Sequence, residues 1–339
     1  MKRLAGLTLT AVLLASASAA WDAYGHRTIT YLALKGLPAE APAWLRSPET
    51  ADRVAFQSNE CDRWKGWPRD SLHHINKPDH YLDVELLENF GLTLETLPRL
   101  RREYVKAMAI SKYVHPEMAG PYDAKRDPAR TQEWPGFALH AIDENYAKLQ
   151  ATFNEIRILE QLNDPRRATQ LRQARENAIF HMGLLAHFVA DVAQPLHTTK
   201  HHNGWVGDNP KGYVAARGIH HAVDSAPASL GLTVESLAPL VKYDAKPNAD
   251  DPWDDVMEYL RRSHALVETV YRLERDGQLD KEPGRKLIEQ RVCDAASMLS
   301  ALYWGAWTSS KPTEKQVADW VRYNDFDAEA RLRARSAHE

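Results

Sequence analysis

A stretch of helical periodicity from about Arg166 to Gln194 ends at Pro195, and it constrains the fold more than any other feature of the sequence. Proline removes a backbone donor and forces the chain out of a helix, so the stretch predicts one long helix with a defined end. Residues 137–163 carry apolar side chains at the same spacing and predict a second long helix that ends near Pro165. The chain is therefore expected to be built on helices.

The rest of the chain continues this pattern. Helical spacing of apolar residues predicts further helices around Ile29–Ala33, over 253–275, over 284–308, and from Glu314 to about Arg333. The segments rich in Gly, Pro, Asn, Asp or His are expected to be loops or insertions, namely 59–85, 86–133, 115–136 and 198–228. Strand signals are few and no linker separates two domains. The sequence therefore predicts a single all-α domain over residues 21–339.

The first 20 residues have the pattern of a secretory leader. Two basic residues precede an apolar stretch over residues 4–15, and Ser18 and Ala20 supply the small residues that a signal peptidase needs. Cleavage after Ala20 would make Trp21 the mature N-terminus, whereas a membrane anchor normally needs roughly 20 apolar residues. We therefore expect a signal peptide over residues 1–20, a periplasmic or secreted protein, and no stable membrane association after cleavage.

Fifteen histidines accompany only two cysteines, Cys61 and Cys293. In an oxidising compartment these two cysteines could form a disulfide, which the sequence leaves open. A protein that binds metal with so few thiols must use imidazole and carboxylate ligands. With 43 Lys and Arg against 46 Asp and Glu, the chain lacks a strong basic footprint for duplex nucleic acid. A polyanionic substrate would therefore have to be held by metal.

The strongest chemical signal is the run from His187 to His197. His187 and Asp191 lie one turn apart on one face of the predicted helix, and Pro195 then turns the chain and presents His197. A single histidine on an apolar helix is usually a core residue. An acid one turn later and a third ligand after the helix end favour a metal site instead, because buried charge must be paired or bound to metal.

Weaker groups of candidate ligands flank this run. His220 and Asp224 repeat the four-residue spacing and offer two more ligands if that segment is helical. The segment 62–83 holds three histidines and several aspartates, too many for spacing to choose among them. After leader cleavage Trp21, close in sequence to His26, would carry an amino group with a pKa of about 7.7 to 8.0, low enough for a metal to displace its proton. Such ligands favour an open, multinuclear hydrolytic zinc site.

Taken in order, these motifs resemble the zinc-dependent single-strand nucleases of fungi, plants and bacteria, called type I nucleases, and the related bacterial zinc-dependent phospholipase C. The resemblance rests on Trp21, Gly25-His26, Asp62 ahead of His80-Tyr81-Leu82-Asp83, the run from His187 to His197, and His220 with Asp224. It implies the all-α fold of that superfamily and a site for three zinc ions. The implied ligands are Asp62, His80, His187 and Asp191 for one ion, His197, His220 and Asp224 for a second, and Trp21, His26 and bridging Asp191 for a third. His73 is the rival to His80.

The resemblance also assigns roles around the ions. Besides the ligand Asp62, Lys65 would stabilise phosphate charge and Asp83 would orient the attacking water or a ligand. A Gly-Gly-Asn element of the family supplies an asparagine that contacts substrate. Here the stretch reads Gly-Asp-Asn, so Asn209 is the candidate and Asn203 competes with it. Nucleotide bases would stack on one of three aromatic side chains, those of Tyr81, Trp64 and Trp205.

The expected function follows from these implied roles. The short spacing between Trp21 and His26, and an aspartate at position 224, look like the nucleases, whereas the phospholipase has a longer spacing and a glutamate. We expect a monomeric enzyme that hydrolyses single-stranded DNA or RNA to 5′-phosphate products, with 3′-nucleotidase activity on nucleotides. The alternatives are a phospholipase C that acts on phosphatidylcholine and a non-catalytic zinc-binding protein of the cell envelope.

Overall fold

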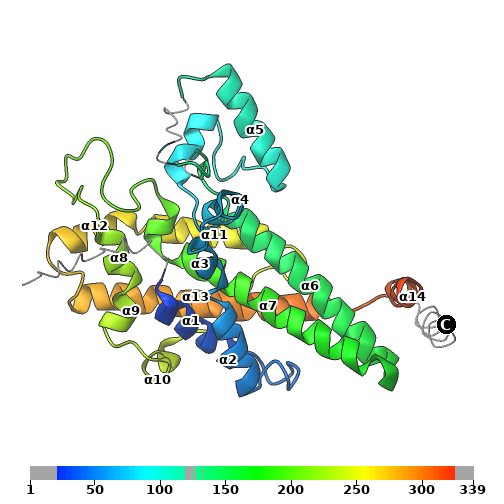
Figure 1. The fold of residues 1–339 in the computed structure, drawn as a ribbon. Coiled ribbons are helices and arrows are strands. Elements are labelled where there is room, and N and C mark those ends of the chain that lie inside the picture. Colours follow the sequence, from blue (N-terminus) through cyan, green and yellow to red (C-terminus); the bar gives the residue numbers. More distant parts are fainter. Residues whose placement is uncertain (1–20, 119–124, 126, 132, 325–339) are drawn as a thin grey trace, which may run out of the picture.

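A computed structural model describes residues 21–118, 125, 127–131 and 133–324. The predicted leader and the chain beyond Asn324, where the last predicted helix was expected to end, lie outside the described residues. In the part that is described, regular structure is helical apart from two isolated β-bridges, and the helices form one body (Figure 1). The predicted all-α fold, a single helical domain, is confirmed.

Two long antiparallel helices form the centre of the domain. They are α6 (Ala138–Leu162) and α7 (Ala168–Ala193), joined through Asn163 in the left-handed conformation and a short 3-10 helix, η3 (Pro165–Arg167). Every residue of α7 from Met182 to Ala193 is buried. Pro195 follows its end, so the two strongest helix predictions are confirmed to within about two residues.

Further helices cover this central pair, and Figure 1 shows α1, α2 and α13 beside α7. These helices are α1 (Ala23–Lys35), α2 (Pro48–Gln57) and α13 (Glu282–Ser309). A side chain at Gly183 would place its Cβ 2.2 Å from the Cβ of Gln57, so glycine lets α2 approach α7 closely. Both α1 and α13 follow the sequence prediction, whereas α2 was not predicted.

The segments 59–85 and 198–228 were predicted as loops, and this is wrong for most of the first and for the C-terminal part of the second. They contain α3 (Glu60–Lys65), α4 (Asp70–Asn76), η1 (Lys77–His80), the start of η2 (Val84–Phe90), η4 (Pro195–Thr198), α8 (Ile219–Asp224) and α9 (Ala226–Ser229). Helices of four to seven residues span too few turns to show a period, and their stability comes from packing rather than propensity.

The remaining helices complete the domain, and the one over Trp253–His264 packs against both central helices. They are α5 (Arg101–Val114), α10 (Val234–Leu237), η5 (Ala238–Leu240), α11 (Trp253–His264), α12 (Val267–Arg275) and α14 (Glu314–Tyr323). The predicted helix over 253–275 is thus two helices, and the predicted insertion 86–133 carries α5, which projects from the body in Figure 1. No helix in the described ranges is long and apolar enough to cross a membrane.

The two cysteines do not pair. Cys61 in α3 and Cys293 in α13 are both free and buried. Burial raises the pKa of both thiols, which keeps them protonated and unreactive. The disulfide that the sequence left open is therefore absent from this structure.

Candidate metal centre

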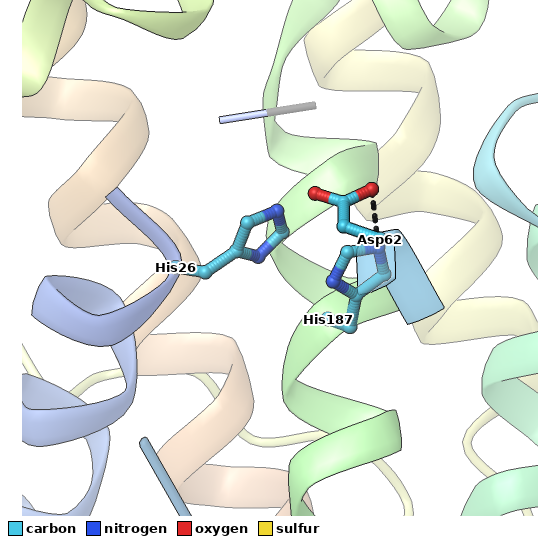
Figure 2. Close-up of side chains that lie close together, drawn as sticks. All are labelled: His26, Asp62 and His187. Atoms are coloured by element: carbon cyan, nitrogen blue, oxygen red, sulfur yellow. Dashed lines mark ion pairs between the residues drawn. The ribbon is translucent and has the colours of Figure 1, made fainter. Parts of the chain in front are cut away.

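Candidate ligands from four elements meet at the buried C-terminal half of α7. His187 and Asp191 come from α7, His26 from α1, Asp62 from α3 and His80 from the end of η1. Figure 2 shows His26, Asp62 and His187 converging, with the rings of the two histidines stacked 4.2 Å apart between centroids. All of these side chains except Asp62 are buried, and that of Asp62 is only 14% exposed.

Four of these side chains have the spacing of one metal site. The His187 Nε2 atom lies 2.9 Å from His80 Nδ1 and 3.4 Å from Asp191 Oδ2, while Asp191 Oδ2 lies 2.9 Å from His80 Nδ1. Asp62 Oδ1 lies 3.8 Å from His187 Nε2 and 4.0 Å from His80 Nδ1. Zinc bonds of 2.0 to 2.2 Å in a tetrahedron separate ligand atoms by roughly 3.3 to 3.6 Å. The observed distances bracket that range.

The Asp191 carboxylate faces two groups of imidazoles at once. Its Oδ1 atom lies 3.3 Å from His26 Nε2, while its Oδ2 atom faces His80 and His187. Burial by itself would raise the pKa of Asp191, but the surrounding histidines hold it well below its usual value. An ionised carboxylate with each oxygen turned toward different imidazoles has the geometry of a bridging ligand.

A further group lies beyond the end of α7. His197 in η4 and His220 and Asp224 in α8 are buried, and one ligand atom from each lies within 4.8 Å of the others. The four-residue spacing predicted the pairing of His220 and Asp224, whose Nε2 and Oδ2 atoms are 3.3 Å apart. The segment is helical, as that prediction required. The structure therefore contains three groups of His and Asp side chains that could bind metal ions. The two groups at α7 share His187, and the third shares no residue with them.

Main-chain carbonyls fix the orientation of three of the imidazoles. The Nδ1 atoms of His187, His197 and His220 lie 2.7, 2.7 and 3.0 Å from the carbonyl oxygens of Ser58, His80 and His202. A carbonyl only accepts, so in each neutral ring Nδ1 carries the proton and Nε2 turns a lone pair toward the site. This is the arrangement that protein metal sites use to hold their histidines.

The protonation states of the imidazoles also suit metal binding. Burial lowers the pKa of His187 to about 3 and that of His197 to about 4, so both rings are neutral at physiological pH. Among the described residues, neither His197 Nε2 nor Asp224 Oδ2 has a hydrogen-bond partner, although both atoms are buried. Burial raises the pKa of Asp224 well above its usual value, so a proton neutralises this carboxyl where no cation does. The residues therefore fit a cation at this group.

Trp21 is held against the same site by two contacts. Its indole Nε1 donates to the Ala190 carbonyl at 2.8 Å, and the next residue, Asp22, donates its backbone N–H to the Asp224 carbonyl at 3.1 Å. The side chain is fully buried, and a Cβ at Gly25 would lie 2.9 Å from that of Trp21. The main chain of Trp21 is thus anchored between two ligand-bearing helices. That its amino group binds metal after cleavage stays a prediction.

Lys65 lies beside the candidate ligands, whereas Asp83 is not part of any of the three groups. Lys65 Nζ lies 2.7 Å from Asp62 Oδ1, directly beside the candidate ligands. Burial lowers its pKa, but the Asp62 and Asp191 carboxylates outweigh this and the pKa ends above its usual value. Asp83 belongs to none of the three groups. It is buried next to Leu82, whose N–H donates to the His197 carbonyl, and burial followed by the Glu85 charge raises its pKa to about 8.

The rival candidates for the other roles have different surroundings in the structure. His80 and not His73 joins a group of candidate ligands. Both ends of the Asn209 amide bind the backbone of Tyr213, so this side chain is committed to its own loop. Asn203 adjoins His202, whose carbonyl orients His220, and its Oδ1 accepts from the Gly218 N–H. Both asparagine side chains are thus bound to backbone groups, and which of them contacts substrate stays a prediction.

The three aromatic candidates for base stacking are all engaged in packing. Trp64 Nε1 donates to Glu60, the Tyr81 hydroxyl donates to the Thr131 carbonyl, and Trp205 stacks on His201 at 3.9 Å between ring centroids. Trp67, two residues after Lys65, is instead 65% exposed. The hydrogen bonds of Trp64 and Tyr81 engage only the edges of their rings, so stacking of a base on any of the three stays a prediction.

Sequence reasoning missed several residues that hold the ligands. Gln194 binds Asp224, and Glu85 accepts from the Thr199 hydroxyl and the Lys200 N–H, which fixes the segment after His197. The sequence feature that could have identified Gln194 is a polar residue directly after the apolar run of α7.

No protein-family model, curated protein or solved structure matches the chain. The chemistry of the site is therefore argued from its residues alone.

Proposed function

We propose that this protein is a zinc-dependent phosphodiesterase that hydrolyses single-stranded nucleic acid to 5′-phosphate products, with 3′-nucleotidase activity, as the resemblance to the type I nucleases implies. One observation carries the proposal. Imidazoles and carboxylates, with no thiolate among them, converge within a few ångströms in three groups of candidate ligands, two of which share His187. Borderline-soft zinc accepts this donor set, and a catalytic site without thiolates keeps coordination positions open to water.

The proposed ligands divide into the sets stated above, with Asp191 shared between two ions. Zinc supplies Lewis acidity, which polarises a phosphoryl oxygen, acidifies water and neutralises developing charge. The contribution of the protein is to keep these imidazoles neutral by burial and to fix their orientation through the carbonyls that accept from their Nδ1–H groups.

Two further side chains serve the reaction in this proposal. Lys65 keeps its charge because of the carboxylates around it, and from its place beside Asp62 it would bind the negative oxygens of the phosphate. Asp83, with a pKa of about 8, holds a proton on its carboxyl near neutral pH and can orient a water molecule next to the His197 segment. Neither role depends on a sequence-specific contact with a base.

Single-stranded substrate is preferred for an electrostatic reason. The chain has a formal net charge of −3, so it lacks the broad basic surface with which proteins grip duplex phosphates. A flexible single strand can instead bring one phosphate into a recessed metal centre at little cost of deformation.

The test presents the zinc-loaded protein that begins at Trp21 with single-stranded DNA, RNA, duplex DNA and phosphatidylcholine in turn, each with an EDTA control. The proposal expects nucleotide release from the single strands, much less from the duplex, and none after EDTA. Headgroup release without nucleotide release would instead identify a phospholipase C. Inactivity on all four substrates, with zinc bound, would identify a zinc-binding protein without this activity.

A further inference from the structure

Gln194 lies between the candidate ligands of α7 and those of the group formed by His197, His220 and Asp224. It is fully buried and follows the last residue of α7, so it lies between Asp191 and His197 in the chain. Its backbone N–H donates to the Asp191 carbonyl at 3.0 Å, and its own carbonyl accepts from the His197 N–H at 3.0 Å. The main chain of one residue thus connects candidate ligands of two groups.

The side chain of Gln194 adds a third connection. Its Nε2 donates to Asp224 Oδ1 at 2.8 Å, and its Oε1 accepts from the Leu196 N–H at 2.6 Å. The second bond settles which end of the amide is oxygen, because a backbone N–H can only donate. The donor end must therefore face Asp224.

This contact gives the two carboxylate oxygens of Asp224 different surroundings. Oδ1 is occupied by the amide, while Oδ2 has no hydrogen-bond partner among the described residues and lies 3.3 Å from His220 Nε2. A carboxylate with one oxygen held by a donor has a fixed plane, and its other oxygen keeps a defined direction. In Asp224 that direction is toward the two histidines of the group.

We propose that Gln194 is a positioning residue for the metal group of His197, His220 and Asp224: its amide donor holds Asp224 Oδ1 so that Oδ2 is presented to the cation. The inference rests on the proposed metal centre but concerns a residue that is not itself a ligand. Outer contacts of this kind typically change metal affinity by about 10- to 100-fold. We expect loss of the donor to weaken one zinc equivalent by that factor and to leave the others unchanged.

The experiment measures zinc binding to the chain from Trp21 onward by competition with a coloured chelator, in three variants. Gln194→Met keeps the length of the side chain and removes both hydrogen bonds. Gln194→Glu keeps an acceptor for the Leu196 N–H and removes the amide donor, so it preserves the turn if the first variant fails to fold. The matched control is Gln150→Met, which removes an amide that donates to Ala249 and Ser309 far from the site.

Thermal unfolding of the metal-free proteins separates positioning from simple stabilisation. Gln194→Met and Gln150→Met should both lower the midpoint, because the first loses buried and the second partly buried hydrogen bonds, but only the Gln194 variants should weaken one zinc equivalent. The visible spectrum of the cobalt-substituted protein should change in the Gln194 variants alone. Three zinc ions bound with wild-type affinity in both Gln194 variants would overturn the inference. A wild-type protein that binds no zinc would instead refute the proposed function.

Discussion

Replacing Asp83 with asparagine should stabilise the metal-free protein near neutral pH. Asp83 is 9% exposed, and no hydrogen bond to its carboxyl is formed within the described part of the chain. Burial, with a smaller effect of the Glu85 charge, raises its pKa from 3.8 to about 8. Asparagine has the shape of the protonated carboxyl and cannot ionise, so it avoids the cost of a buried charge.

The magnitude follows from proton linkage. Between pH 3.8 and about 8 the folded protein holds a proton on Asp83 that the unfolded chain has lost, so stability falls as the pH rises through this window. Each pH unit in the window contributes about 1.4 kcal/mol. Asp83→Asn should therefore raise the free energy of unfolding by up to about 4 kcal/mol at pH 7 and change it little near pH 4.

The assay is urea unfolding of the EDTA-treated protein at several pH values from 4 to 8. Metal is removed because bound cations would themselves lower the pKa of a nearby carboxyl. Glu88→Gln, which changes an exposed carboxylate in η2, the helix that follows Asp83, is the matched control and should leave the pH dependence unaltered. A stability difference that is the same at pH 4 and pH 7, or a destabilised Asp83→Asn at pH 7, would refute the reasoning.

Three further predictions concern the metal centre. Asp191→Ala should lose zinc from two positions at once, because its two oxygens face different imidazoles, and full retention of three zinc ions by metal analysis would contradict the bridging role. One extra residue before Trp21 should leave the mature protein short of one zinc ion, measured by the same analysis, since the amino group would be displaced. Lys65→Met should lower kcat on single-stranded DNA by roughly 100- to 1,000-fold while zinc content is kept; unchanged kcat would remove Lys65 from the reaction.

The long helices and the pairing of ligands within them were predictable from the sequence. A helix over 166–194 must place His187 and Asp191 on one face, and Pro195 must end it, whatever surrounds it. The same four-residue spacing predicted the contact of His220 with Asp224 once that segment proved helical. These features depend only on local backbone geometry, which the sequence encodes directly.

Other parts of the site depend on tertiary contacts that no local pattern reveals. The short helices α3 and η1, which bring Asp62 and His80 to α7, were predicted as loops because they carry too few turns to show a period. The carbonyl groups that orient the histidines belong to the main chain, so no residue type in the sequence marks them. The hydrogen bonds between Asn209 and Tyr213 likewise depend on the path of one loop. The contact of Gln194 with Asp224 forms only because the fold brings α8 to the end of α7.

The most direct test of the metal centre is the zinc content of the purified chain that begins at Trp21, determined by atomic emission after extensive dialysis. The geometry of the three groups and the shared Asp191 predict three zinc ions per chain, all removable by EDTA. A folded protein that retains no stoichiometric zinc, with zinc present throughout its preparation, would contradict the central claim.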